Sequence, residues 1–357
     1  MLNEFVLLCK PCKDLQGEQK ARIFAGDTRF EVRTDMDFKK LDKRFKQFGG
    51  FRLLREYARL GVLGVGMKSF FRCWAKGTSF KGIYPQILKK VEPFLERKYA
   101  PVVQAFKNRS GQTCLKHDRS RIIWFCWLQG LEQAPALVRV CHDSLKRHLP
   151  GWEIKVIDGG NWRDFVELPG YVVRKWEKGR IPAANFSDLL RLELLIRYGG
   201  TWVDATVLCT GEPASGIPLS TYLDADLFLF QYTPEGTTKG IRISNWYITS
   251  CTNHPVLMAV REMLYAYWKD YDCTIDYYMF HLFFEMVARE YPEQIAAMPY
   301  GSSQRSIALG RHWNEPFKQE QWDRLVRRVA FHKLSYRVSA VVKKNKENYY
   351  NYLISAL

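Results

Sequence analysis

The sequence lacks the features that mark a membrane-spanning or secreted protein. It contains no apolar run that approaches the roughly 20 residues needed by a bilayer-spanning helix. Its N-terminus, MLNEFVLLCKPCK, is too short and becomes charged too soon to resemble a signal peptide. We therefore expect an intracellular, cytoplasmic protein.

Histidines and cysteines are not spaced as metal ligands. The seven histidines form no two-His metal spacing, and the nine cysteines follow no disulfide framework. Cys9 and Cys12 form a CxxC, but there is no second pair for zinc and no βα pattern after it for redox chemistry. Cys126, Cys209 and Cys251 lie in apolar segments, where cysteine behaves as a small hydrophobe, so free thiols are expected.

Acidic residues are scarce relative to basic ones. The chain has 37 Asp and Glu against 54 Lys and Arg, for a formal net charge of +17. Such a charge favours an anionic partner, which can be nucleic acid, an acidic membrane face or a phosphorylated substrate. Because no zinc-finger, RNP or basic-zipper pattern is present, we expect no nucleic-acid partner.

The composition divides the chain into three regions. Residues 1–110 are predicted to form a basic helical region, because segments 38–60 and 67–74 interleave Lys and Arg with aromatic residues and Leu. This region either packs as a helical subdomain on the rest of the chain or attaches peripherally to an anionic bilayer, and both can hold. Residues 111–340 are predicted to be α/β, and residues 341–357 to be a basic, tyrosine-rich C-terminal tail.

Within the α/β region, apolar runs predict strands, and an apolar helical pattern predicts a helix after the first of them. The strands are expected at Ile122–Trp127, Trp152–Ile157, Asp226–Tyr232 and Ile243–Thr249, and the helix at Ala136–His148. Pro255 suits the first position of a later helix.

The most informative stretch is residues 185–206, NFSDLLRLELLIRYGGTWVDAT, which predicts a helix, a tight turn and a buried strand. Ser187 is the expected N-cap, and Asp188 is expected in the first turn, where the helix dipole favours an anion. Gly199 and Gly200 stop the helix, and Asp204 ends the strand. In an open α/β sheet, ligands bind at the carboxyl ends of the strands.

Two interpretations of this stretch compete. Asp188 and Arg191 share a helix face and can be an ordinary surface pair, with Asp204 merely ending a strand. The combination favours function, because a strand-end carboxylate can hold a divalent cation against a diphosphate. A nearby Asp and Arg can bind sugar hydroxyls and phosphate oxygens.

The pattern SDLLRxxLLxxYGGTWVDAT resembles the donor-site signature of glycosyltransferase family 32, in particular its capsular polysaccharide synthesis protein branch. The resemblance covers roughly residues 121–336. It implies a GT-A type, Rossmann-like nucleotide-sugar-binding domain with an Asp-x-Asp motif for Mn²⁺ or Mg²⁺. Here the motif is Asp204, Ala205, Thr206, and one carboxylate with a hydroxyl makes a weaker cation site than two carboxylates.

The resemblance also implies roles for residues outside the motif. Trp127 would stack on the nucleobase, although an isolated Trp is as often part of a core. Asp276 would lie near the transferred sugar as a catalytic residue with Arg191, and its competing interpretation is a plain helix N-cap. His332 would complete the metal shell with Asp204 and Thr206, although a lone His is more often structural. Lys333 would contact phosphate.

The sequence therefore predicts a metal-dependent, retaining glycosyltransferase, a hexosyltransferase of capsular or other surface polysaccharide biosynthesis. A nucleotide-diphosphate sugar would be the donor, and a lipid-linked or other saccharide the acceptor. The basic surface would place the protein peripherally on the cytoplasmic membrane face. One alternative is a non-catalytic scaffold with a transferase fold in a polysaccharide assembly complex, because the second Asp of the motif is missing. A nucleic-acid-binding protein, which the net charge alone would permit, is the second and less favoured alternative.

Overall fold

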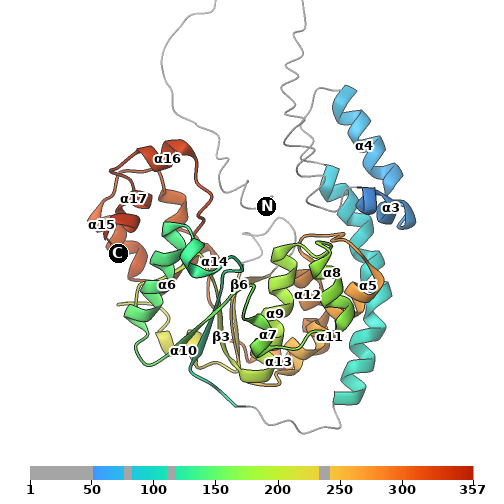
Figure 1. Cartoon of the computed structure of the whole chain (residues 1–357), viewed down its shortest axis with the longest axis horizontal. Helices are drawn as coiled ribbons and strands as arrows, with labels where there is room; N and C mark the ends of the chain where they lie inside the picture. Colours follow the sequence, from blue (N-terminus) through green and yellow to red (C-terminus); the bar gives the residue numbers. More distant parts are fainter. Residues whose placement is uncertain (1–50, 76–82, 111–117, 233–241, 357) are drawn as a thin grey trace, which may run out of the picture.

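The computed structural model describes residues 51–75, 83–110, 118–232 and 242–356. The expectations for Cys9 and Cys12, and for the basic segment before residue 51, lie outside these residues. In the described part of the chain, helices pack on both faces of a central five-stranded sheet (Figure 1).

The central sheet has the strand order β2-β1-β3-β6-β5. Strand β1 pairs in parallel with β2 and β3, whereas β6 is antiparallel to both β3 and β5. The expected α/β class is therefore confirmed as a mixed sheet that contains parallel strands. The strands are β1 (Ile122–Cys126), β2 (Glu153–Ile157), β3 (Gly200–Asp204), β5 (Leu227–Gln231) and β6 (Ile243–Ser250).

The two faces of this sheet are covered by different helices, because side chains alternate along each strand. In β1, Trp124 joins a core with one set of helices, while Ile123 and Phe125 face the other set. The first set is α5 (Ile83–Ser110), α7 (Trp162–Phe165), α8 (Gly170–Glu177), α9 (Ala183–Tyr198), α11 (Pro255–Asp270) and α12 (Met279–Glu290). The second face packs on α6 (Ala136–His148) and α10 (Leu219–Leu223).

A second, two-stranded sheet joins the C-terminal part of the chain to the site region. Strand β4 (Val207–Cys209) pairs antiparallel with β7 (Phe331–Lys333). The remaining elements of the described chain are η2 (Leu131–Gln133), α13 (Pro292–Ala296), α14 (Ser303–Ser306), η4 (Leu309–His312), α15 (Gln319–Val326), α16 (Ala340–Lys344) and α17 (Tyr349–Ala356).

The last helix is part of the core. Helix α17 packs against α6, and its residues Tyr349 and Leu353 are fully buried. Through this helix, the segment that the composition sets apart as a tail is anchored to the α/β region by apolar contacts.

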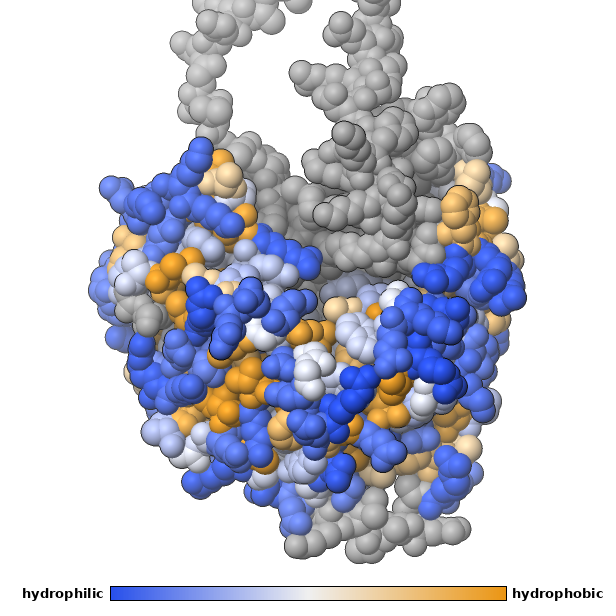
Figure 2. All heavy atoms as spheres, in the orientation of Figure 1, coloured by the Kyte–Doolittle hydropathy of each residue, from blue (hydrophilic) through white to orange (hydrophobic). Residues whose placement is uncertain are grey.

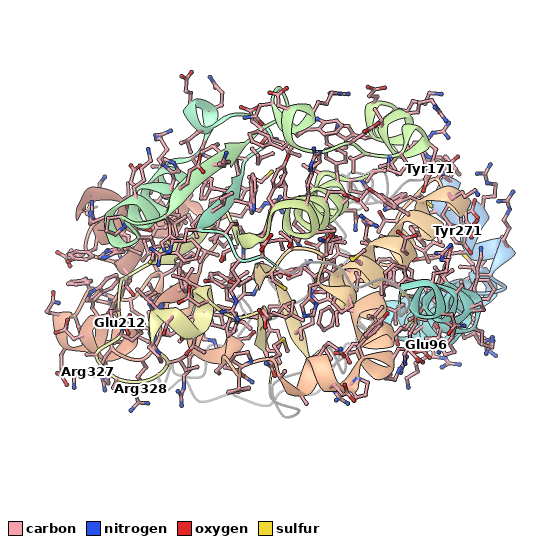
Figure 3. The ribbon with its side chains drawn as sticks, turned by 90° about the horizontal axis from the view of Figure 1, so that it is seen from below. Glu96, Tyr171, Glu212, Tyr271, Arg327 and Arg328 are labelled. Atoms are coloured by element: carbon pink, nitrogen blue, oxygen red, sulfur yellow. The ribbon has the colours of Figure 1, made fainter. Side chains whose placement is uncertain are left out.

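The long helix α5 also packs on the α/β region, as the packed-subdomain interpretation requires. It lies along α11 and α12 and buries Val91, Leu95 and Tyr99. The Tyr99 hydroxyl donates a hydrogen bond of 2.9 Å to Asp270. In Figure 3, α5 is seen at the side marked by Glu96, opposite the side that carries Glu212, Arg327 and Arg328.

Two shorter helices precede α5, namely α3 (Phe51–Arg59) and α4 (Leu63–Ala75). They leave large apolar side chains in solvent, with Phe51 82% and Met67 47% exposed. Figure 2 shows apolar surface at the side where α3 and α4 lie, bordered by hydrophilic surface, and further apolar patches lower on the same face. None of the helices in the described ranges combines the length and apolar character needed to cross a bilayer.

Candidate active site

Helix α9 and strand β3 provide the framework of the site. The helix begins earlier than expected, because Pro182 is its N-cap and Ser187 lies inside it, with its hydroxyl donating to the Ala184 carbonyl at 2.7 Å. The prediction that Ser187 caps the helix and that Asp188 lies in the first turn is therefore wrong. The environment of Asp188 is set by buried side chains and not by the helix terminus.

The double glycine between helix and strand behaves as predicted. Gly199 and Gly200 have φ values of +67° and +89°, which side chains rarely adopt. A Cβ at Gly200 would lie 2.4 Å from the Ile122 carbonyl oxygen, so the turn needs glycine for space as well as for conformation. The turn leads into β3, and Asp204 at its end is paired in register with Cys126 at the end of β1.

Arg191 joins the two carboxylates of the motif. Its Nη1 lies 2.7 Å from Oδ1 of Asp188, and its Nη2 lies 3.4 Å from Oδ1 of Asp204. Its guanidinium carbon lies 4.9 Å from the centre of the Trp202 ring, and the Trp202 indole N–H donates to Asp204 at 3.1 Å. The surface-pair interpretation is therefore wrong, because Arg191 and Asp188 are a buried ion pair that faces the strand-end acid.

Lys333 completes the charge cluster from the far end of the chain. Its ammonium lies 3.0 Å from Oδ2 of Asp204 and 2.7 Å from the hydroxyl of Thr206. Strand β7 fixes this placement, because Lys333 is paired with Val207 and the Leu334 N–H donates to the Thr206 carbonyl. The structure thus brings together Asp188, Arg191, Asp204, Thr206 and Lys333 from three segments of the chain.

The cluster is buried at one end and open at the other. The side chains of Arg191 and Asp188 are 4% and 7% exposed, whereas those of Lys333 and Asp204 are 20% and 28% exposed. A ligand in solvent therefore meets Lys333 and Asp204 first. Arg191 contacts Asp204 from the buried end of the cluster.

The two carboxyl groups have opposite pKa shifts. Burial raises the pKa of Asp188 to about 6, although Arg191 opposes this. Burial also acts to raise the pKa of Asp204, but the charges of Lys333 and Arg191 outweigh it and hold the pKa below its ordinary value. Asp204 is therefore ionised at neutral pH and keeps its two cations in place.

Sequence reasoning missed the amide partners of Asp188. The Asn245 side chain donates to Oδ1 of Asp188 at 2.9 Å, and Asn185 also bonds Asp188 and lowers its pKa. The one available signal was an amide inside the apolar run of β6, because a polar residue in a buried strand needs a partner.

Asp276 lies in the loop before α12 and is 2% exposed. Its carboxylate accepts the Tyr278 N–H at 2.9 Å, and Tyr278 is the N-cap of α12, so the interpretation of Asp276 as a plain helix N-cap is wrong. The same loop reaches the cluster, because the Thr274 hydroxyl donates to Asn185 at 3.0 Å. From the other side, the Tyr57 hydroxyl of α3 donates to the Ile275 carbonyl at 3.2 Å.

Trp127 follows β1 at the same sheet edge as Asp204. Its ring meets the Tyr336 ring edge to face, with centroids 5.3 Å apart. Its indole N–H is buried and has no hydrogen-bond partner among the described residues. Trp127 also packs against the core on one face of the sheet, and it lies one residue beyond Cys126, the register partner of Asp204.

His332 is not brought to the cluster. It is adjacent to Lys333 in β7, so its side chain points to the opposite face, where its Nε2 lies 3.2 Å from the Thr210 hydroxyl. It is fully buried, and burial lowers its pKa to about 4, so it is neutral.

The expected divalent cation does not fit the residues found here. With His332 turned away, the donor set is one carboxylate and one hydroxyl, and Lys333 contacts both. Within the described ranges, no group of three or more His, Cys, Asp or Glu is arranged to hold a metal ion. A hard cation prefers several charged oxygens and would here have an ammonium as its neighbour.

The five cysteines whose side chains the structure describes are free, as expected. Burial raises the pKa of Cys126, which lies beside Asp204, to about 12, so this thiol is not a nucleophile at neutral pH. The other free thiols are Cys141, Cys209, Cys251 and Cys273.

Comparisons with known proteins identify the family. A family model described as capsular polysaccharide synthesis protein matches residues 73–353. No curated protein matches the chain. Among solved structures, the chain is similar to one titled "PaToxG Glycosyltransferase", with 13% identity, 74% of this chain and 97% of that chain covered, and a TM-score of 0.33. A likeness at that TM-score carries no weight here.

Proposed function

We propose that this chain, which belongs to the capsular polysaccharide synthesis protein family, is a glycosyltransferase that uses a nucleotide-diphosphate sugar. The observation that supports this most directly is the cluster at the end of β3, where Lys333 and Asp204 form the open end of a buried charge network. Cations held beside a strand-end carboxylate suit a diphosphate and a sugar hydroxyl. A GT-A type arrangement of the sheet is part of the same proposal.

Three residues of the cluster and the aromatic pair of Trp127 and Tyr336 have distinct roles in this proposal. Lys333 binds the diphosphate. Asp204 accepts a hydrogen bond from a sugar hydroxyl and keeps its contact with Lys333. Arg191 positions Asp204, because it is buried and already bonded to both carboxylates. Trp127, with Tyr336, forms an aromatic wall against which a nucleobase can stack.

We infer a retaining reaction from the resemblance of residues 185–206 to glycosyltransferase family 32. The bond between the anomeric carbon and the diphosphate oxygen breaks, and the acceptor hydroxyl oxygen forms the new bond on the same face. The departing phosphate takes the acceptor proton, and Lys333 stabilises the charge that develops on the diphosphate. The buried, turn-bonded Asp276 shapes the sugar side and is not needed as a base.

A saccharide, free or lipid-linked, is the proposed acceptor. Contact with an anionic membrane face is supported by the exposed Phe51 and Met67 beside the exposed cations of α3, Arg52, Arg55 and Arg59. This surface would bring the protein to a lipid-linked acceptor on the cytoplasmic side.

A panel of nucleotide-diphosphate sugars tests the function. We expect one donor to raise the melting temperature of the wild-type protein and to be turned over with a saccharide acceptor. Proton NMR of the product should show the anomeric configuration of the donor. A product of inverted configuration would require an acid such as Asp276 to act as the base. Stabilisation without turnover for any acceptor would favour the scaffold alternative.

A further inference from the structure

The residues at the open end of the cluster have an ammonium where the resemblance implies a metal ion. We propose that Lys333 supplies the positive charge for the donor diphosphate, so that this chain binds its donor without a divalent cation. This inference rests on the proposed function, since it concerns the same diphosphate site.

Lys333 already contacts the oxygens that a metal ion would need. The oxygens that the sequence offers a cation are those of Asp204 and Thr206, and Lys333 lies 3.0 Å and 2.7 Å from them. The other oxygen of Asp204 accepts from Trp202 and Arg191. Both carboxylate oxygens are therefore engaged by this chain's own donors. An ammonium has three N–H donors, so two contacts leave one for a phosphate oxygen.

The formal charge of the cluster also disfavours a metal ion. The cluster contains the carboxylates Asp188 and Asp204 and the cations Arg191 and Lys333, so its formal charges balance. A dication added here would leave an excess of positive charge in a partly buried site. Because Thr206 stands where a second carboxylate would be, the cluster lacks the negative charge that would offset it. A diphosphate, in contrast, brings the charge that Lys333 can pair.

Backbone contacts of strand β7 fix the position of Lys333. Its backbone is held by pairing with Val207 and by the hydrogen bond from Leu334 N–H to the Thr206 carbonyl. Its side chain is 20% exposed, so the ammonium is both anchored and accessible. A surface lysine that meets Asp204 by chance would have neither constraint.

The test measures binding of nucleoside diphosphates (UDP, GDP, CDP and ADP) by isothermal titration calorimetry, in EDTA and in Mn²⁺. We expect wild type to bind one of them with the same Kd, within about twofold, in both buffers. Lys333→Met, which keeps the apolar stem, should bind at least about tenfold more weakly in EDTA. The matched control is Arg328→Met, because Arg328 is an exposed cation at the edge of the molecule (Figure 3).

Binding by wild type only in Mn²⁺, or equal binding by Lys333→Met, would overturn the inference. A second measurement separates it from the proposed function, namely Mn²⁺ titration of the nucleotide-free protein followed by electron paramagnetic resonance. We expect no stoichiometric Mn²⁺ site. A site that is present in wild type and lost in Asp204→Asn would overturn the role of Lys333 even if no nucleotide bound. Absence of nucleotide binding in every buffer would overturn the donor site and this inference together.

Discussion

The buried carboxyl of Asp188 should make the stability of this protein depend on pH in an unusual direction. Its pKa is raised from 3.8 to about 6 by burial, which outweighs the attraction of Arg191. Between these two values the folded protein holds a proton on Asp188 that the unfolded chain has released. The free energy of unfolding contributed by this group is therefore largest below pH 4 and falls as pH rises toward 6.

The size of the effect follows from the shift. One pKa unit corresponds to about 1.4 kcal/mol, so a shift of about two units predicts a loss of about 3 kcal/mol between pH 4 and pH 7. The side chain is only 7% exposed, so little screening by solvent reduces this value. Above pH 7 the contribution should be constant, because Asp188 is then ionised in both states.

Urea unfolding of wild type and Asp188→Asn between pH 4 and pH 8 measures this contribution. Asparagine does not titrate, so the wild-type free energy minus that of the variant isolates Asp188 and removes the general acid sensitivity of a basic protein. We expect this difference to fall with pH up to about 6 and then level off. Asp226→Asn is the control, since that carboxylate is 64% exposed. A difference that rises with pH would refute the reasoning, because it would mean that Arg191 dominates and lowers the pKa.

Three further predictions concern the site, the turn and the basic helices. Asp204→Asn should lower donor turnover by at least about a hundredfold, measured by product formation, while circular dichroism shows an unchanged fold; near-normal turnover would contradict the site. Gly200→Ala should lower the free energy of unfolding, measured in urea, by about 3 kcal/mol or more, since its Cβ would collide with the Ile122 carbonyl. The control Gly179→Ala, with φ +61° and open space around it, should lower it by about 1 kcal/mol. Flotation with phosphatidylglycerol vesicles should recover the protein at low salt and lose it at high salt, and equal recovery with neutral lipid would count against contact of α3 and α4 with an anionic bilayer.

The helix, turn and strand at residues 185–206 were predictable because their signals are local. A glycine pair with positive φ and an apolar run that ends in a carboxylate need no knowledge of distant residues. The helix Ala136–His148 was predicted at its observed bounds for the same reason. The start of α9 was missed because Pro182 is a weaker cap signal than Ser187, yet its fixed backbone begins the helix there.

The contacts between distant segments were not predictable. Asn245 bonds Asp188 because α9 packs against β6, and no local pattern reveals that neighbour. Lys333 and His332 are adjacent in sequence and were both expected at the site. Only the pairing of β7 with β4 decides that Lys333 faces Asp204 while His332 faces Thr210. The alternation of a strand therefore separates two residues that sequence reasoning had grouped.

Contacts between distant segments also connect helix α3 to the proposed acceptor side. Helix α3 lies outside the residues that the family model matches, yet the Tyr57 hydroxyl bonds the carbonyl of Ile275 in the loop that carries Asp276. Burial raises the pKa of Tyr57, and the charge of Asp276 raises it further, so the two groups are close in space. Because the Thr274 hydroxyl of this loop bonds Asn185, which in turn bonds Asp188, α3 is connected through the loop to the charge cluster. The helix that we propose to contact an anionic bilayer therefore has its inner contacts on the loop that we propose lies beside the sugar.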